Sequence, residues 1–234
     1  RRTLEGEPSF QATARGLQTL AAAGMAANLT AVVSAGSVRG LDRLLDFALW
    51  CGNVHGVGLD LVRPQGRGAG AGLSPSPQAL AEGLNRLLAR HDQLARLGRP
   101  VRLKELERLR LLLRTGCRRD CYCNAQTGRS LAVTPDGRLW PCSALAGAEG
   151  SLLGTLGAGT GLEPPEECAR CPAFGLCGGG CPAARRAGPS PLDCQMHRRM
   201  LEHACRLEGK LEWWNTWKTA FPDREEPDDK EESQ

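Results

Sequence analysis

The sequence predicts an α/β protein with two unlike halves: helices alternating with parallel strands, then a cysteine-rich region. Two observations support this prediction. Helical and strand periodicities alternate over residues 9–114, and ten of the 11 cysteines lie between positions 117 and 205. Alternating order favours parallel strands joined by right-handed crossovers. Because two strands alone make no stable parallel sheet, we expect the first half to be the end of a larger barrel.

The first helix and strand are expected near the start of the chain. The helix covers residues 9–24, since Ser9 can cap it and Gly24 can end it. The side chains expected to share its inner face are Phe10, Leu17 and Leu20. The stretch 28–34 (NLTAVVS) is short and β-branched, which is typical of a buried strand.

A second helix and strand follow, and two further helices complete this half. We expect the helix over 38–52 and the strand over 54–62. The core-facing residues of that helix would be Leu41, Leu44, Leu45 and Ala48. A long helix is expected over 77–96, with Pro77 in its permissive first turn, and a charged helix over 103–114.

The second half contains a hairpin and a C-terminal helix. Residues 129–142 read as two short strands joined by the turn 135–137 (PDG), where glycine can supply a positive φ. The stretch 196–217 reads as one helix. The tryptophans expected to pack it against the body are Trp213, Trp214 and Trp217. Other residues expected in the core are Cys51 and Cys205, with His55 a candidate for burial, whereas those expected at the surface are His91, His197 and His203.

Composition excludes several partners. The tail 223–234 has seven acidic and two basic residues and no aliphatic or aromatic side chain, so we expect disorder there. One tyrosine and four phenylalanines offer few stacking platforms, which argues against nucleic acid. No apolar run reaches the roughly 18 residues that span a membrane, and no signal peptide is evident, so we expect a cytoplasmic protein without a membrane partner.

The stretch 168–181 (CARCPAFGLCGGGC) holds four cysteines and raises three possibilities: disulfides, zinc or iron–sulfur clusters. Clustered cysteines in a reducing compartment more often bind metal than form disulfides. Two zinc sites and two [4Fe–4S] cubes would each use eight thiolates, so the count leaves both open. The glycines 178–180 would let the backbone fold closely around a bulky cluster and donate amides to its sulfurs.

The full spacing is more specific than the count. It reads Cys117-x5-Cys123-x13-Gly137-x4-Cys142, then Cys168-x2-Cys171-x5-Cys177-x3-Cys181-x12-Cys194. This resembles the SPASM domain of radical S-adenosylmethionine enzymes, in the form that carries two fully ligated auxiliary [4Fe–4S] clusters. The resemblance implies the C-terminal portion of a partial (β/α) radical SAM barrel, followed by a cysteine-rich SPASM domain with a β-hairpin and short helices.

The resemblance also implies a domain division and two interleaved sets of ligands. The division is 1–115 for the barrel portion, 116–205 for the SPASM domain, 206–222 for a C-terminal helix and 223–234 for the tail. The first cluster would take Cys117, Cys123, Cys142 and Cys181. The second would take Cys168, Cys171, Cys177 and Cys194. Cys121 stays open as a replacement for Cys117 or Cys123.

For S-adenosylmethionine itself, the resemblance points to Arg1 at the methionine carboxylate, with Arg2 as the alternative, and to Val62 against the adenine. A surface arginine and a plain core valine are the other interpretations. The Cys-x3-Cys-x2-Cys loop that binds a third [4Fe–4S] cluster in this family is absent from the sequence. We therefore expect the chain to be the C-terminal part of a longer enzyme and inactive alone.

The implied function is the modification of a peptide or protein substrate by hydrogen abstraction, with an electron donor such as flavodoxin or ferredoxin. Ser143 follows Cys142 where anaerobic sulfatase maturases carry an aspartate. This departure favours crosslinking of a ribosomally made peptide over formylglycine formation. The alternative is a non-catalytic iron–sulfur electron-transfer or binding module descended from such an enzyme.

Overall fold

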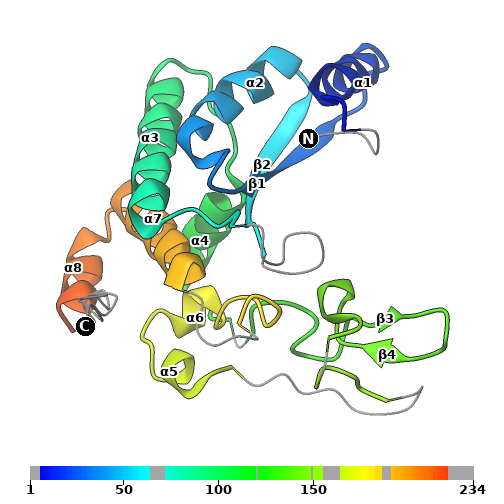
Figure 1. The fold of residues 1–234 in the computed structure, drawn as a ribbon. Helices are drawn as coiled ribbons and strands as arrows, with labels where there is room; N and C mark the ends of the chain where they lie inside the picture. The colour runs from blue at the N-terminus through cyan, green and yellow to red at the C-terminus, as the bar shows by residue number, and fades with distance from the viewer. Residues whose placement is uncertain are drawn as a thin grey trace, which may run out of the picture.

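The computed structural model describes residues 6–63, 72–119, 121–148, 150–154, 164–185 and 191–220. Figure 1 shows helices around two strands in the upper part and the short elements of the cysteine-rich half below them. The expectations for Arg1, Arg2 and the tail 223–234 lie outside the described residues. Within the described ranges, no helix is long and apolar enough to cross a membrane.

The alternating half has the predicted order and the predicted parallel pairing. Its elements are α1 (Phe10–Ala22), β1 (Ala27–Val33), η1 (Val38–Gly40), α2 (Arg43–Cys51), β2 (Val54–Leu61), α3 (Pro77–Arg96) and α4 (Lys104–Thr115). β1 and β2 are parallel, with Val33 opposite Leu61. The stretch expected as one helix over 38–52 divides into η1 and α2, and Gly52 ends α2 at a φ of 73°.

The core of this half lies between the helices and one face of the strands. Val57 and Leu59 of β2 are buried together with leucines of α2, α3 and α4. α3 begins at Pro77, as predicted, because the Ser76 hydroxyl oxygen accepts a hydrogen bond from the Ala79 amide at 3.2 Å. The local capping signal therefore fixes the start of the longest helix.

The other face of β1 is open. Burial alternates along the strand, so Asn28 and Thr30 are exposed and Val32 is 55% exposed. β2 is better covered, since the backbone before α4 lies along it and the Val57 amide donates to the Arg102 carbonyl at 2.8 Å. Parallel sheets are normally covered on both faces. The exposed face of β1 is therefore unusual for a strand of this kind.

The cysteine-rich half contains the predicted hairpin and short helices. Its elements are β3 (Ala132–Val133), β4 (Leu139–Trp140), η3 (Ser143–Leu145), α5 (Glu166–Ala169) and α6 (Phe174–Cys177). β3 and β4 pair antiparallel, which confirms the hairpin, although its strands are shorter than the stretch 129–142. Gly137 in the turn has a φ of 79°, the conformation for which glycine was expected.

The prediction of one C-terminal helix over 196–217 is wrong. The structure has two helices, α7 (Pro191–Leu207) and α8 (Leu211–Ala220), because Gly209 between them adopts a φ of 67°. Trp214 and Trp217 of α8 are buried, and their rings stack with centroids 4.5 Å apart. Trp213 is 41% exposed, contrary to expectation, since neighbouring residues of a helix point in different directions.

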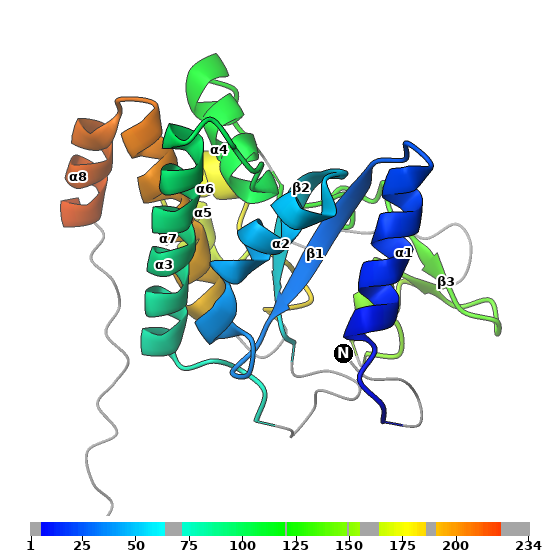
Figure 2. The same cartoon turned by 90° about the horizontal axis from the view of Figure 1, so that it is seen from above.

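The prediction for the inner face of α1 is partly wrong. Ala14 and Leu17 are buried, and Leu20 is partly buried. Phe10 is 60% exposed, with its ring centroid 5.3 Å from that of Phe47. The Ser9 side chain makes no capping hydrogen bond. Figure 2 shows α1 at the outer end of the layer, beside β1.

The surface assignment of three histidines is also wrong. His91, His197 and His203 are buried, at 6%, 8% and 6% exposure, because α7 packs against both α3 and α4 (Figure 2). Burial lowers the pKa of His203 to about 4. His55, the candidate for burial, is exposed at the start of β2. Cys51 and Cys205 are buried, as expected.

Candidate functional site

Four cysteines from separate segments of the second half interact with one another. Cys168 belongs to α5, Cys171 follows that helix, Cys177 ends α6, and Cys194 lies in the first turn of α7. Burial raises the pKa of the Cys194 thiol to about 11, and the nearby Cys177 and Cys168 add to this rise. The residue as a whole is still exposed to solvent. Burial likewise raises the pKa of Cys177, with Cys168 and Cys171 adding to the effect. The four thiols are therefore electrostatic neighbours.

The glycine run after α6, residues 178–180, lies beside these four cysteines. Gly178, Gly179 and Gly180 have φ values of 74°, 83° and 73°, so the backbone turns sharply at each. The amides of Gly179 and Gly180 donate to the Cys177 sulfur and oppose the rise of its pKa. Successive amides aimed at a sulfur are the arrangement expected around a cysteine that binds a cluster as thiolate.

At Gly178, the glycine run also packs closely against the backbone of the segment that carries Cys121 and Cys123. A Cβ atom at Gly178 would lie 2.3 Å from both the carbonyl carbon and the oxygen of Cys121, and 2.6 Å from the Tyr122 nitrogen. Only glycine therefore fits at this crossing. Two stretches of cysteines, far apart in the sequence, meet here backbone to backbone.

The spacing of the sulfurs can be compared with what a metal would require. A single tetrahedral zinc with Zn–S bonds of about 2.3 Å holds its sulfurs about 3.8 Å apart. Among the described residues, no three cysteine sulfurs lie within 4.8 Å of one another. A [4Fe–4S] cube binds each thiolate through a different iron, which calls for a wider set. The donor type, thiolate, is shared by zinc sites and [4Fe–4S] clusters.

The other predicted ligands lie in segments after α4, after β4 and after the glycine run. Cys117 is exposed after α4, and Cys123, Cys142 and Cys181 are half-buried. Cys181 directly follows the glycine run. Cys121, the alternative ligand, is half-buried against Gly178. The structure thus places the first set in the cysteine-rich half of the molecule.

A charged cluster that sequence reasoning missed lies beside these cysteines. The Tyr122 ring has the guanidinium groups of Arg108 and Arg119 each 5.8 Å from its centroid, and the His197 ring 5.7 Å away, edge-on. Burial raises the pKa of Tyr122 to about 12, and the neighbouring Cys181 adds to this rise. Burial lowers the pKa of His197 to about 4, assisted by Arg108. The phenol and the imidazole are therefore both neutral at pH 7.

Arg63 connects the end of β2 to this cluster. Burial alone would lower the pKa of Arg63, but Cys181 and Asp60 raise it above its ordinary value. Its guanidinium donates to the Asp60 carboxylate at 2.9 Å. Val62, next to it, is half-buried, and its amide donates to the Val33 carbonyl at 2.9 Å. The carboxyl ends of both strands therefore lie on the side of the cysteine-rich half, where parallel sheets bind their ligands.

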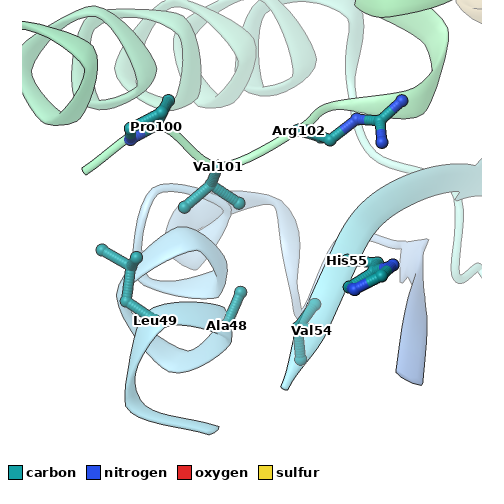
Figure 3. Close-up of a pocket in the computed structure, with 7 residues that line it drawn as sticks. All are labelled: Ala48, Leu49, Val54, His55, Pro100, Val101 and Arg102. Atoms are coloured by element: carbon teal, nitrogen blue, oxygen red, sulfur yellow. The ribbon is translucent and has the colours of Figure 1, made fainter. Parts of the chain in front are cut away.

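Figure 3 shows a pocket at the opposite end of the strands. Its volume is about 300 Å³, and its lining residues are Ala48, Leu49, Val54, His55, Pro100, Val101 and Arg102. Val54 is the first residue of β2, so the pocket lies at the amino end of that strand. Sites in parallel α/β folds lie at the carboxyl ends. We therefore place the candidate site at the cysteines and not in this pocket.

No family model matches the chain, and no curated protein matches it. Solved structures of anSMEcpe, an anaerobic sulfatase-maturating enzyme, are similar to it. Native anSMEcpe with bound AdoMet gives a TM-score of 0.64 at 18% identity, covering 91% of this chain and 63% of that chain. The histidine-tagged form with bound AdoMet gives 0.66 at 18% identity, covering 92% and 62%. The native form with AdoMet and Kp18Cys peptide gives 0.65 at 18% identity, covering 92% and 65%.

The chain thus spans less than two thirds of the length of these structures. At 18% identity the likeness concerns the fold alone. The mixed α/β chain has a fold like that of a radical S-adenosylmethionine enzyme, with its alternating half and its cysteine-rich half both included in the match.

Proposed function

We propose that the chain is part of a radical S-adenosylmethionine enzyme that modifies a peptide or protein substrate, and that it holds two auxiliary [4Fe–4S] clusters. The observation that supports this most directly is the group formed by Cys168, Cys171, Cys177 and Cys194 inside a fold of this type. Auxiliary clusters in such enzymes supply electron transfer or substrate orientation when bound.

The chain's own residues would prepare the two ligand sets. Cys168, Cys171, Cys177 and Cys194 would hold one cluster, and the Gly179 and Gly180 amides would stabilise the Cys177 thiolate. The second set would be Cys117, Cys123, Cys142 and Cys181, with Cys121 as the alternative to either of the first two. The half-buried guanidinium groups of Arg63, Arg108 and Arg119 would offset part of the negative charge of eight thiolates.

The open face of β1 agrees with a barrel that continues beyond β1. Exposed Asn28, Thr30 and Val32 would face the interior of that barrel, on the side where β2 carries Gly56 and Gly58. Further strands would cover this face. S-adenosylmethionine would bind at the carboxyl ends, with Val62 against the adenine and Arg1 or Arg2 at the carboxylate. The third cluster would be bound by the part of the barrel that carries the Cys-x3-Cys-x2-Cys motif.

The partner we propose is a peptide or protein, since two of the similar structures contain peptides, described as Kp18Cys and Cp18Cys. Ser143 after Cys142 favours crosslinking of a ribosomally made peptide. A small electron donor such as flavodoxin or ferredoxin would supply reducing equivalents, and the cytoplasm, where such donors work, is the proposed location.

We expect residues 1–234 alone to make no 5′-deoxyadenosine from S-adenosylmethionine. The chelating amino and carboxylate groups of that cofactor need an iron with an open position, and each proposed cluster has four cysteine ligands. The measurement is chromatography of 5′-deoxyadenosine after anaerobic reconstitution and reduction. Fusion to an upstream segment with the Cys-x3-Cys-x2-Cys motif should restore its formation.

Two outcomes would count against this proposal. Turnover by the isolated chain would mean that an auxiliary cluster lacks a cysteine ligand, with Cys117 or Cys121 the first to question. Failure of the fused protein to cleave S-adenosylmethionine, with all three clusters present, would favour the non-catalytic module.

A further inference from the structure

A second group of metal-ligating side chains lies between α3 and α7, away from the cysteines. His91 and Asp92 are neighbours on α3, and His203 faces them from α7. Both imidazoles are buried, at 6% exposure, and their centroids lie 5.7 Å apart with the rings edge to face. The proposed function uses none of these three residues.

The distances within this group suit one small cation. His203 Nε2 lies 3.1 Å from Asp92 Oδ1, and His91 Nδ1 lies 3.7 Å from the same oxygen. One potential ligand atom from each of the three residues lies within 4.8 Å of those from the other two. A tetrahedral zinc ion bound at about 2.0–2.1 Å holds its nitrogen and oxygen ligands about 3.3 Å apart. The two measured contacts lie on either side of that value.

We propose that His91 Nδ1, Asp92 Oδ1 and His203 Nε2 form a binding site for a divalent transition-metal ion of the zinc type, with water as fourth ligand. Two imidazoles and one carboxylate are ligands that such ions prefer. Within the described part of the chain, the buried His91 Nδ1 makes no hydrogen bond, since Asp92 Oδ1 lies 3.7 Å from it, beyond hydrogen-bonding distance. This inference stands independently of the proposed function.

In its observed position, Arg206 of α7 disfavours binding of an ion at this site. Its guanidinium donates to Asp92 Oδ2 and lies 2.8 Å from His203 Nδ1. Because arginine only donates, His203 Nδ1 must accept, and the imidazole proton must sit on Nε2, towards Asp92. An ion on Nε2 moves that proton to Nδ1, where it would face a second donor. Arg206 must therefore withdraw, and its side chain, 46% exposed, has solvent to move into.

The bound ion would tie α3 to α7. This matters for the rest of the molecule because the first turn of α7 carries Cys194. A link at His203 holds the helix in place two to three turns further along. Ion binding should therefore raise the unfolding temperature of the chain by mass action.

The test is a zinc titration of the full chain after anaerobic reconstitution of its cysteine sites. Wild type should hold one zinc more than His203→Gln. Zinc K-edge X-ray absorption of that ion should show nitrogen and oxygen ligands at about 2.0–2.1 Å, whereas zinc on cysteines shows sulfur at about 2.3 Å. The sulfur signal therefore reports a failure of the proposed clusters separately from a failure of this site.

Arg206 gives the sharper variant. Arg206→Gln should bind the zinc at least about tenfold tighter, because it removes the opposing donor and its amide oxygen can accept the Nδ1 proton. Arg199→Gln, which makes the same change on the same helix at a residue paired with Glu202 at 3.8 Å, should leave the affinity unchanged. The proposal is overturned if wild type and folded His203→Gln hold equal zinc, or if Arg206→Gln binds zinc no tighter than wild type.

Discussion

Gly178→Ala should prevent stable cluster binding and unfold much of the cysteine-rich half. The new Cβ would lie 2.3 Å from the backbone carbon and oxygen of Cys121, and backbone cannot move aside as a flexible side chain can. The residue also has a φ of 74°, which costs an alanine roughly 1–2 kcal/mol before any clash. Together we expect a loss above about 3 kcal/mol, in the range of strongly disruptive substitutions.

Gly180→Ala provides the matched control. Gly180 has nearly the same φ, 73°, but no atom lies within 4 Å of the position that a Cβ would take there. This variant should lose only the roughly 1–2 kcal/mol of backbone strain and keep its iron. Iron content and the thermal unfolding midpoint are the measurements. Equal losses in the two variants would show that the crossing at Cys121 does not limit the fold of this half.

Cys194→Ala and Cys181→Ala should each remove about four irons, but from different clusters. Cys194 lies among Cys168 and Cys177, whereas Cys181 is assigned to the other set. Electron paramagnetic resonance of the reduced protein should therefore lose a different signal in each variant. Loss of the same signal in both would contradict the interleaved assignment.

Cys205→Ala is the control for this pair. Cys205 lies on the same helix as Cys194 and is fully buried in the core. Replacement removes one sulfur atom from a packed site, so we expect a small loss of stability and no loss of iron. A loss of iron in this variant would mean that general destabilisation, and not ligand removal, explains the other two.

Much of the fold follows from local signals in the sequence. The bounds of α3 agree with the predicted 77–96 because Ser76 and Pro77 define its start locally. The break between α7 and α8 also has a local signal, Gly209, which the helical periodicity on either side obscured. The buried histidines have none, because their burial depends on α7 packing between α3 and α4, far away in sequence.

The candidate site was predictable only in part. The family resemblance implied one ligand set of Cys168, Cys171, Cys177 and Cys194, and in the structure these cysteines are close enough to influence one another's pKa. The charged cluster at Tyr122 could not be read from the sequence. Its members come from α4, the segment between Cys117 and Cys123, and α7, and only the tertiary fold makes them neighbours.

The central claim is that the cysteines hold two [4Fe–4S] clusters, and its most direct test is a metal and sulfide count. Residues 1–234, reconstituted anaerobically and freed of loose metal, should contain about eight irons and about eight acid-labile sulfides per chain. The brown chromophore should bleach with dithionite. Stoichiometric zinc on the cysteines with negligible sulfide would contradict the account.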